Sequence, residues 1–194
     1  MTDNMTAIVE ALIFAAEQPI SVEQIKALIS GSDTAQIRQS IEQLSRDYEN
    51  SGRGVRIDEV AGGYRMTTAS GCSGFVRKLY RQRRSDRLSR QSMETLAIIA
   101  YKQPVTKQEI QSLRSVNIDG VMKSLQERNL IKITGKKETP GRPYVFGTGK
   151  QFLEYFGLKS IEDLPKLDSI EVGADILAGL QQPAALNAPE KEGA

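Results

Sequence analysis

The N-terminal part of the chain repeats apolar side chains at the three- and four-residue spacing of an amphipathic helix. This predicted stripe consists of Ile8, Val9, Leu12, Ile13 and Ala16. Ser21 and Gln24 stand at the spacing of a capping box and predict a second helix. Asp33 and Gln36 predict a third helix in the same way. We therefore expect three short helices in succession.

Two runs with the alternation of β-strands follow the third helix. They are Val55–Ile57 and Tyr64–Thr68, separated by a turn that we place at Gly62 and Gly63. Three helices followed by a β-hairpin are the plan of a small winged helix-turn-helix domain.

The stretch from Ser89 to Leu158 repeats this plan. EALIFAAEQP near the N-terminus matches ETLAIIAYKQP, which is one residue longer. Ile20-Ser21 then matches Val105-Thr106, and Thr106 with Glu109 repeats the capping box.

The pattern also predicts the remaining elements of the second copy. A third helix is expected from about Asn117, with Ile118, Val121, Met122 and Leu125 facing inward. LIKI and YVF are the wing strands, and the loop 135–143 is the wing tip. We expect Thr148 and Gln151 to cap a last helix that ends at Gly157.

The predicted fold class is mainly α with small β-wings (α+β), as two tandem winged helix-turn-helix domains. Residues 1–70 are the expected N-terminal winged helix and dimerisation domain, and 71–88 a basic linker. Residues 89–158 are the C-terminal winged helix. The remainder, 159–194, is read as a weakly structured to disordered tail because Pro, Ala, Glu and Gly dominate its end.

Charge is unevenly distributed along the chain. Residues 1–74 carry 6 basic and 10 acidic side chains, a net charge of −4, whereas residues 75–90 carry 7 and 1, a net charge of +6. Residues 91–158 have a net charge of +4 and residues 159–194 a net charge of −4. Net positive charge is therefore confined to the linker and the second domain.

Composition argues against an enzyme. The chain contains no histidine, and Cys72 is its only cysteine. A disulfide within one chain, a zinc cluster and a histidine general base are excluded, and the glycines of GRPYVFGTGK do not match a phosphate-binding loop. No run approaches the roughly 18 apolar residues of a membrane span. We expect no catalytic residue, metal or cofactor, no membrane partner, and a cytoplasmic location.

The third helices do not suit a DNA groove. In the first domain Arg38 and Arg46 face four acidic residues in and beside the helix, and in the second domain the charges cancel. The candidates for non-specific phosphate contact lie elsewhere. They are Arg81, Arg83, Arg84, Arg87, Lys136 and Lys137. A solvated charged face is the alternative interpretation of the linker.

Three phrases occur in order along the chain: ETLAIIAYKQPVTKQEI, LQERNLIKITGKKETPGRPYVFGT and FLEYFGL. Together they closely resemble the segregation and condensation protein B (ScpB) family. The resemblance is dense over 89–158 and looser over 5–88, where ALIFAAEQPIS fits the first helix of the family. Ser115 departs from the glycine of the family pattern.

The resemblance implies a non-catalytic scaffold subunit of a bacterial SMC–kleisin complex. Such a protein binds the kleisin ScpA as a homodimer and reaches the SMC ATPase only through that kleisin. It supports chromosome condensation and segregation at the nucleoid, with weak or indirect DNA contact. The alternative function is a winged-helix transcriptional regulator that binds DNA.

Aromatic residues gather around the second wing and the last helix. We expect Phe146, Phe152 and Phe156 in the core. Tyr144 and Tyr155 are candidate partner contacts because tyrosine combines an apolar ring with a polar hydroxyl. Arg142 is a third candidate, on a loop stiffened by its neighbours Gly141 and Pro143.

Overall fold

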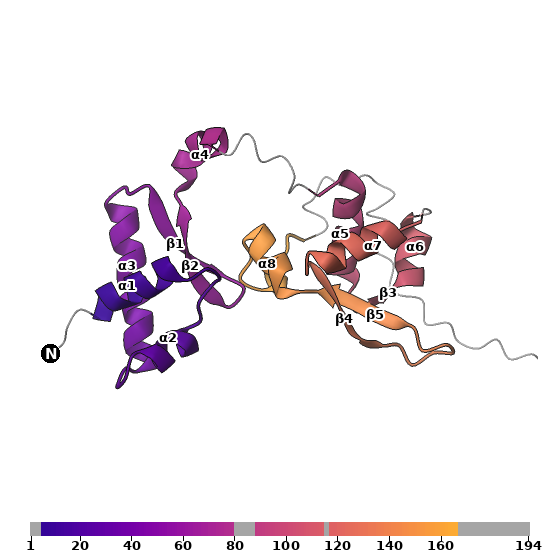
Figure 1. Ribbon diagram of the computed structural model, residues 1–194, viewed down its shortest axis with the longest axis horizontal. Coiled ribbons are helices and arrows are strands. Elements are labelled where there is room, and N and C mark those ends of the chain that lie inside the picture. The colour runs from indigo at the N-terminus through magenta and orange to yellow at the C-terminus, as the bar shows by residue number, and fades with distance from the viewer. Residues whose placement is uncertain (1–4, 80–87, 115–116, 167–194) are drawn as a thin grey trace, which may run out of the picture. The chain divides into compact units, whose positions relative to one another are not determined.

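The structure, a computed structural model, describes residues 5–79, 88–114 and 117–166. Its contacts divide the chain into two units (Figure 1). Unit 1 draws on Met1–Leu88 and Lys150–Asp163, and unit 2 on Ser89–Gly149 and Leu164–Ala194.

Unit 1 consists of helices and one antiparallel hairpin. Its elements are α1 (Met5–Ala15), α2 (Val22–Leu28), α3 (Thr34–Asn50), β1 (Val55–Val60), β2 (Gly63–Thr68), η1 (Ser70–Cys72), α4 (Ser73–Leu79), α8 (Lys150–Phe156) and η2 (Ile161–Asp163). The three predicted helices and the predicted hairpin are confirmed.

The core of unit 1 lies where the first three helices meet. Its buried side chains are Val9, Ile13, Val22, Ile25, Ile37, Ile41 and Leu44. Tyr64 and Met66 of the hairpin pack against this cluster. Burial of each large aliphatic side chain contributes about 1.5–3 kcal/mol, so the cluster is the main stabilising element of the unit. Ile8, which we predicted on the inward stripe, is exposed instead.

The turn of the hairpin lies one residue earlier than predicted. Ala61 and Gly62 form it, with φ of 52° and 73°, as a two-residue turn with both central φ positive requires. Gly63 is the first residue of β2. A Cβ there would lie 2.9 Å from the Pro19 carbonyl carbon, so glycine lets the two chain segments approach closely.

This close approach brings a third extended segment, at Ile20, alongside the hairpin of unit 1. Ile20 and Tyr64 exchange backbone hydrogen bonds of 2.9 and 2.8 Å in an antiparallel bridge. The bridge ties the segment before α2 to the hairpin.

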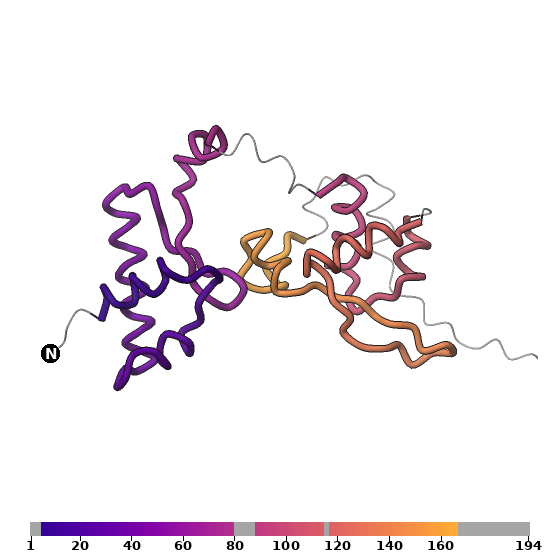
Figure 2. Tube along the Cα trace, viewed as in Figure 1, coloured from indigo at the N-terminus to yellow at the C-terminus, as the bar shows by residue number. Residues whose placement is uncertain are grey.

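Unit 2 repeats this arrangement with a longer wing. Its elements are α5 (Arg90–Lys102), β3 (Val105–Thr106), α6 (Lys107–Arg114), α7 (Asp119–Glu127), β4 (Ile131–Lys136) and β5 (Tyr144–Thr148). The sheet is antiparallel in the order β3-β5-β4. The trace in Figure 2 shows the β4–β5 hairpin extending beyond the helices of its unit.

The internal repeat is confirmed at the level of strand pairing. Ile20 pairs with the hairpin of unit 1, and the matching Val105 pairs with Phe146 of the wing in unit 2. Ile118, Met122 and Leu125 are buried as predicted, whereas Val121 is only half-buried. The predicted α+β fold with two small antiparallel sheets is confirmed.

The start of α8 differs from the prediction, and its end agrees with it. The expected cap at Thr148 is wrong, because Thr148 ends β5 and α8 begins at Lys150. The Thr148 backbone N–H and hydroxyl donate to Gln103 Oε1 at 2.7 and 3.1 Å. Gly157 ends α8 with φ 68°, and the Leu158 N–H donates to the Leu153 carbonyl at 2.9 Å.

The division by contacts differs from the predicted ranges after β5. Residues 150–163 group with unit 1, because the Ala61 N–H donates to the Leu158 carbonyl at 2.9 Å and Lys159 pairs with Glu59 at 2.9 Å. The predicted linker 71–88 contains α4, and its residues 80–87 lie outside the described residues, as does the tail from residue 167. Among the described helices, none is long and apolar enough to cross a membrane.

Replacing Ile98 of α5 by aspartate is expected to destabilise the protein severely. Ile98 is 1% exposed, and loss of a buried aliphatic side chain costs about 2–5 kcal/mol before the charge is buried. The matched control is Met93→Asp on the same helix, where the side chain is 39% exposed. Thermal unfolding should show a large loss of Tm for Ile98→Asp and a small one for the control; equal losses would contradict the burial assigned here.

Candidate partner-binding surfaces

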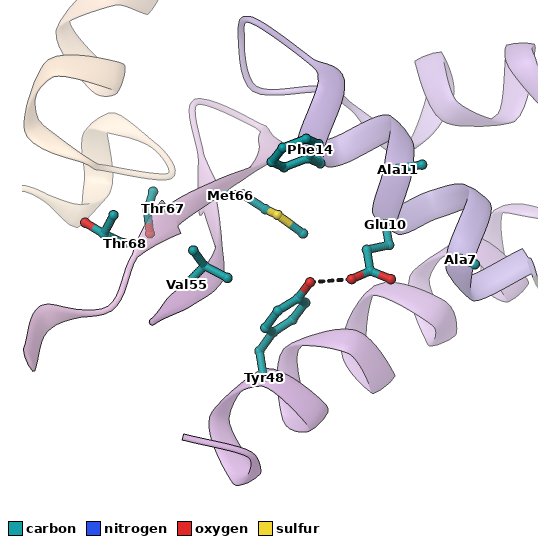
Figure 3. A pocket seen from close by; sticks show the side chains of 9 residues that line it. All are labelled: Ala7, Glu10, Ala11, Phe14, Tyr48, Val55, Met66, Thr67 and Thr68. Atoms are coloured by element: carbon teal, nitrogen blue, oxygen red, sulfur yellow. Dashed lines mark hydrogen bonds between the residues drawn. The ribbon is translucent and has the colours of Figure 1, made fainter. Parts of the chain in front are cut away.

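Unit 1 carries an open apolar groove of about 530 Å³ between α1, the end of α3 and the hairpin (Figure 3). We call it the unit 1 groove. Its lining residues are Ala7, Glu10, Ala11, Phe14, Tyr48, Val55, Met66, Thr67 and Thr68. Val55 and Met66 project from the hairpin toward Tyr48 and α1.

The groove follows from the composition of α1. Val9 and Ile13 face the core, yet the opposite side of the helix is also apolar, with Ala7, Ala11 and Phe14. The small alanines leave space beside the hairpin, and Phe14 is 76% exposed at its edge. A helix that is apolar on both sides lacks the polar face that water normally solvates. This side of α1 is therefore suited to contact another protein surface.

The polar centre of the groove joins α1 to α3. The Tyr48 hydroxyl donates a hydrogen bond to the Glu10 carboxylate, and this bond raises the pKa of Tyr48. The Arg53 guanidinium lies 5.6 Å from the centroid of the Tyr48 ring. Glu10 is the charged residue among those that line the groove. The groove thus offers an apolar surface with one carboxylate, which suits an apolar helix that carries a cation.

The second surface is the wing of unit 2, which brings two predicted contact residues together. Tyr144 is 51% exposed, and Lys136, its cross-strand partner, places Nζ 4.9 Å from the ring centroid. Arg142 is exposed at the wing tip with φ 41°, and its N–H donates to the Thr139 carbonyl at 2.8 Å.

The third predicted contact residue lies in the other unit. Tyr155 belongs to α8, is half-exposed and meets the Phe156 ring edge-on at 5.1 Å between centroids. The core prediction is confirmed for Phe146 and Phe152 but wrong for Phe156, which is exposed. Phe156 lies in the last turn of α8, directly before Gly157 ends the helix.

Two of the six phosphate-contact candidates are described, and both already have partners. Lys137 Nζ lies 2.6 Å from Glu109 Oε1, and Lys136 stacks on Tyr144. The other four candidates, Arg81, Arg83, Arg84 and Arg87, lie outside the described residues.

Glu109 connects α6 to the wing. Its Oε2 accepts from the Thr106 N–H at 2.7 Å and from the Thr106 hydroxyl at 2.8 Å, and the Glu109 N–H donates to the Thr106 hydroxyl at 3.3 Å. The predicted capping box is confirmed. Burial alone would raise the pKa of Glu109, but the hydrogen bonds from Lys137 and Thr106 outweigh it and hold the pKa below its ordinary value.

Among the described residues, three ion pairs involve charged side chains of the third helices. In α3, Arg46 pairs with Glu42 at 3.1 Å, and in α7, Lys123 lies 3.9 Å from Glu127. Asp119 at the start of α7 pairs with Lys107. These acids compensate the cations that a DNA-reading helix would present to phosphates. The described residues also contain no group of three or more His, Cys, Asp or Glu side chains that could hold a metal ion.

Two winged-helix units, each with an exposed apolar or aromatic surface, define a tandem winged-helix protein. A family model described as segregation and condensation complex subunit ScpB matches residues 7–167, and the chain belongs to this family. It is 46% identical to segregation and condensation protein B of Syntrophotalea carbinolica, over 86% of this chain and 83% of that protein. It is 43% identical to the protein of the same name from Symbiobacterium thermophilum, over 86% and 76%.

Solved structures are also similar to the chain. A conserved hypothetical protein from Chlorobium tepidum is 37% identical, over 79% of this chain and 96% of that one, with a TM-score of 0.38. A dimer of an ScpB N-terminal domain complexed with an ScpA peptide is 31% identical, over 38% and 88%, with a TM-score of 0.36.

Sequence reasoning missed the unit 1 groove. It assigned the first helix one inward stripe and left Phe14 without a role. The signal was present, because Ala7, Ala11 and Phe14 recur at helical spacing outside the stripe. What the sequence alone did not reveal is that the hairpin leaves this side of α1 uncovered.

Glu109→Gln is expected to lower stability at neutral pH by removing the charge that Lys137 and Thr106 stabilise. A carboxylate with a depressed folded pKa contributes stability above its unfolded pKa, and this contribution disappears as the pH falls through the folded pKa, below 4.5. Denaturant unfolding of both proteins at pH 7 and pH 3 should therefore show a difference that shrinks at the lower pH. The control is Glu127→Gln, whose carboxylate is mostly exposed. A difference that persists at pH 3 would assign the effect to packing instead.

Proposed function

We propose that this chain is a non-catalytic scaffold subunit of a bacterial SMC–kleisin complex, which forms a homodimer and binds an ScpA-type kleisin. Its role is to support chromosome condensation and segregation, with the SMC ATPase reached through the kleisin. The observation that carries the proposal is the exposed apolar surface of α1, with Phe14 at its edge, in a member of the ScpB family.

Self-association through unit 1 accounts for that surface. Phe14 is 76% exposed on α1 and lines the unit 1 groove together with Ala7 and Ala11. Soluble monomers rarely leave large contiguous apolar patches in water, and such patches mark interfaces. A domain of about 75 residues also buries only about 60–65% of its unfolded surface, so a partner adds needed burial. We place the main dimer interface within residues 1–70.

Kleisin binding follows from the family and suits the second surface. A related ScpB N-terminal domain was solved as a dimer with an ScpA peptide. For this chain, we propose that the kleisin contacts the wing of unit 2. There Arg142 and Tyr144 offer a cation and an aromatic ring, and both side chains are exposed. Arginine and tyrosine are enriched among the residues that dominate interface energies. An acidic kleisin segment matches the positive charge of this wing.

Catalysis and sequence-specific DNA reading are not part of this proposal. The chain has no histidine and no phosphate-binding loop pattern. On the third helices, Arg46 pairs with Glu42 and Lys123 with Glu127. Any contact with DNA is expected to be weak and sensitive to salt.

Phe14→Asp is expected to weaken the homodimer about 10-fold or more without unfolding the chain. Phe14 is 76% exposed, so its loss removes little internal packing, whereas a charge in an apolar interface is costly. Sedimentation of the full chain at several concentrations measures the change. Leu28→Asp is the matched control, since Leu28 is 64% exposed on α2 and does not line the groove. Equal effects of the two variants, or none, would contradict an interface on α1.

Calorimetric titration with the central region of ScpA from the same organism is expected to show saturable binding. Random duplex DNA at about 150 mM salt should bind weakly or not at all. Arg142→Ala with Tyr144→Ala should reduce the kleisin affinity about 10-fold. Met93→Ala, an exposed change on α5, is the control. Saturable DNA binding without kleisin binding would contradict the scaffold function and support a DNA-binding regulator.

A further inference from the structure

The helix α4 exposes the apolar side chains that a folded domain normally buries. Phe75 is 75% exposed and Leu79 is 77% exposed, one helical turn apart on the same side. Lys78 lies beside this pair, with Nζ 5.7 Å from the centroid of the Phe75 ring. In Figure 1, α4 stands apart from α1, α2 and α3 of its own unit. Within the described residues, α4 is thus an amphipathic arm whose two largest apolar side chains are mostly exposed.

The unit 1 groove has the complementary features. It is apolar and open, and its lining includes the Glu10 carboxylate. Tyr48 uses one Glu10 oxygen, Oε1, which leaves the other for a second donor. An amphipathic helix that lays two apolar anchors in a groove is a common mode of recognition between proteins.

We infer that α4 of one copy docks in the unit 1 groove of a second copy, so that two chains exchange arms. Phe75 and Leu79 enter the apolar part of the groove, and Lys78 pairs with Glu10. The inference rests on the proposed homodimer and extends its interface beyond residues 1–70, which contain the groove, to the arm α4 at Ser73–Leu79.

Overall charge favours the same pairing. Residues 1–74 carry a net charge of −4, whereas residues 75–90 carry +6. Two of these cations, Arg77 and Lys78, belong to α4 itself. The acidic body of one unit 1 therefore attracts the arm of another over about a Debye length, roughly 8–10 Å at physiological salt. An exchange of identical arms about a two-fold axis satisfies both grooves at once and leaves none open.

The connection between β2 and α4 directs the arm away from its own groove. The groove ends at Thr68, and only residues 69–72 separate it from α4. The Ala69 N–H donates to the Gly54 carbonyl, and the Cys72 N–H donates to the Ala69 carbonyl, both at 2.9 Å. A Cβ on Gly54 would lie 3.7 Å from Cys72 Sγ, so these two residues are also close. To fold α4 back onto its own groove would break these contacts, whereas a second copy leaves them intact.

Cross-linking distinguishes exchange from folding back. In a Cys72→Ser background, Ala11→Cys marks the groove and Leu79→Cys marks the arm. With a short bifunctional maleimide, an equal mixture of the two single variants should give a covalent dimer, and each variant alone should give much less. The double variant should give chains linked between copies. A double variant linked within one chain would overturn the exchange.

Sedimentation of the uncross-linked full chain separates failure of this inference from failure of the homodimer. A dimer that gives no groove-to-arm cross-link places the interface elsewhere and overturns the exchange alone. A chain that stays monomeric at tens of micromolar overturns both proposals.

Substitutions provide the second measurement. Phe75→Asp with Leu79→Asp should weaken the dimer about 10-fold or more, and Leu28→Asp should not. Lys78→Glu should weaken it, and Glu10→Lys added to Lys78→Glu should restore part of the loss. Unchanged dimer affinity together with a fall in ScpA affinity would show that the arm or groove receives the kleisin instead, and would overturn the inference.

Discussion

Both units depend on the pairing of a short segment after a proline with the inner strand of a hairpin. In unit 1 this segment is Ile20, which exchanges hydrogen bonds with Tyr64, and in unit 2 it is β3, which pairs with β5. The pairing fixes each wing against its helices. Close packing around this pairing also explains why glycine occupies two positions whose φ angles do not require it. A Cβ on Gly63 would meet the Pro19 backbone, and one on Gly147 would lie 2.8 Å from Gln103 Oε1.

The sequence predicted most of the fold because its signals are local. Helical spacing and the capping boxes at Ser21 and Thr106 act within a few residues, and they are confirmed. The internal repeat is confirmed as well, because each copy is built from the same local patterns. The misses depend on contacts that are distant in sequence. The hairpin turn lies one residue earlier than predicted, and Gly63 belongs to β2, where it packs closely against Pro19. The Thr148 hydroxyl donates to Gln103, 45 residues away, and does not cap a helix.

The candidate surfaces were only partly predictable for the same reason. Arg142 and Tyr144 are neighbours on one hairpin, so sequence proximity placed them together. The unit 1 groove combines α1 with Tyr48 of α3 and Met66 of β2, and no local pattern relates these elements. The charge pattern was more informative. Acids beside the third helices were visible in the sequence, and the structure shows Glu42 and Glu127 pairing with the cations of those helices.

Marginal size and exposed apolar surface are linked in unit 1. The net folding free energy of a small domain is only a few kcal/mol, so the burial of one large side chain is a substantial fraction of it. Phe14 on α1 and Phe75 and Leu79 on α4 are three such side chains in one unit. If these side chains are buried only on association, folding is coupled to dimerisation, and the measured stability depends on protomer concentration. In the proposed homodimer, a fold usually associated with DNA reading serves as an assembly module, because the apolar side chains that a more stable monomer would bury are buried by the partner instead.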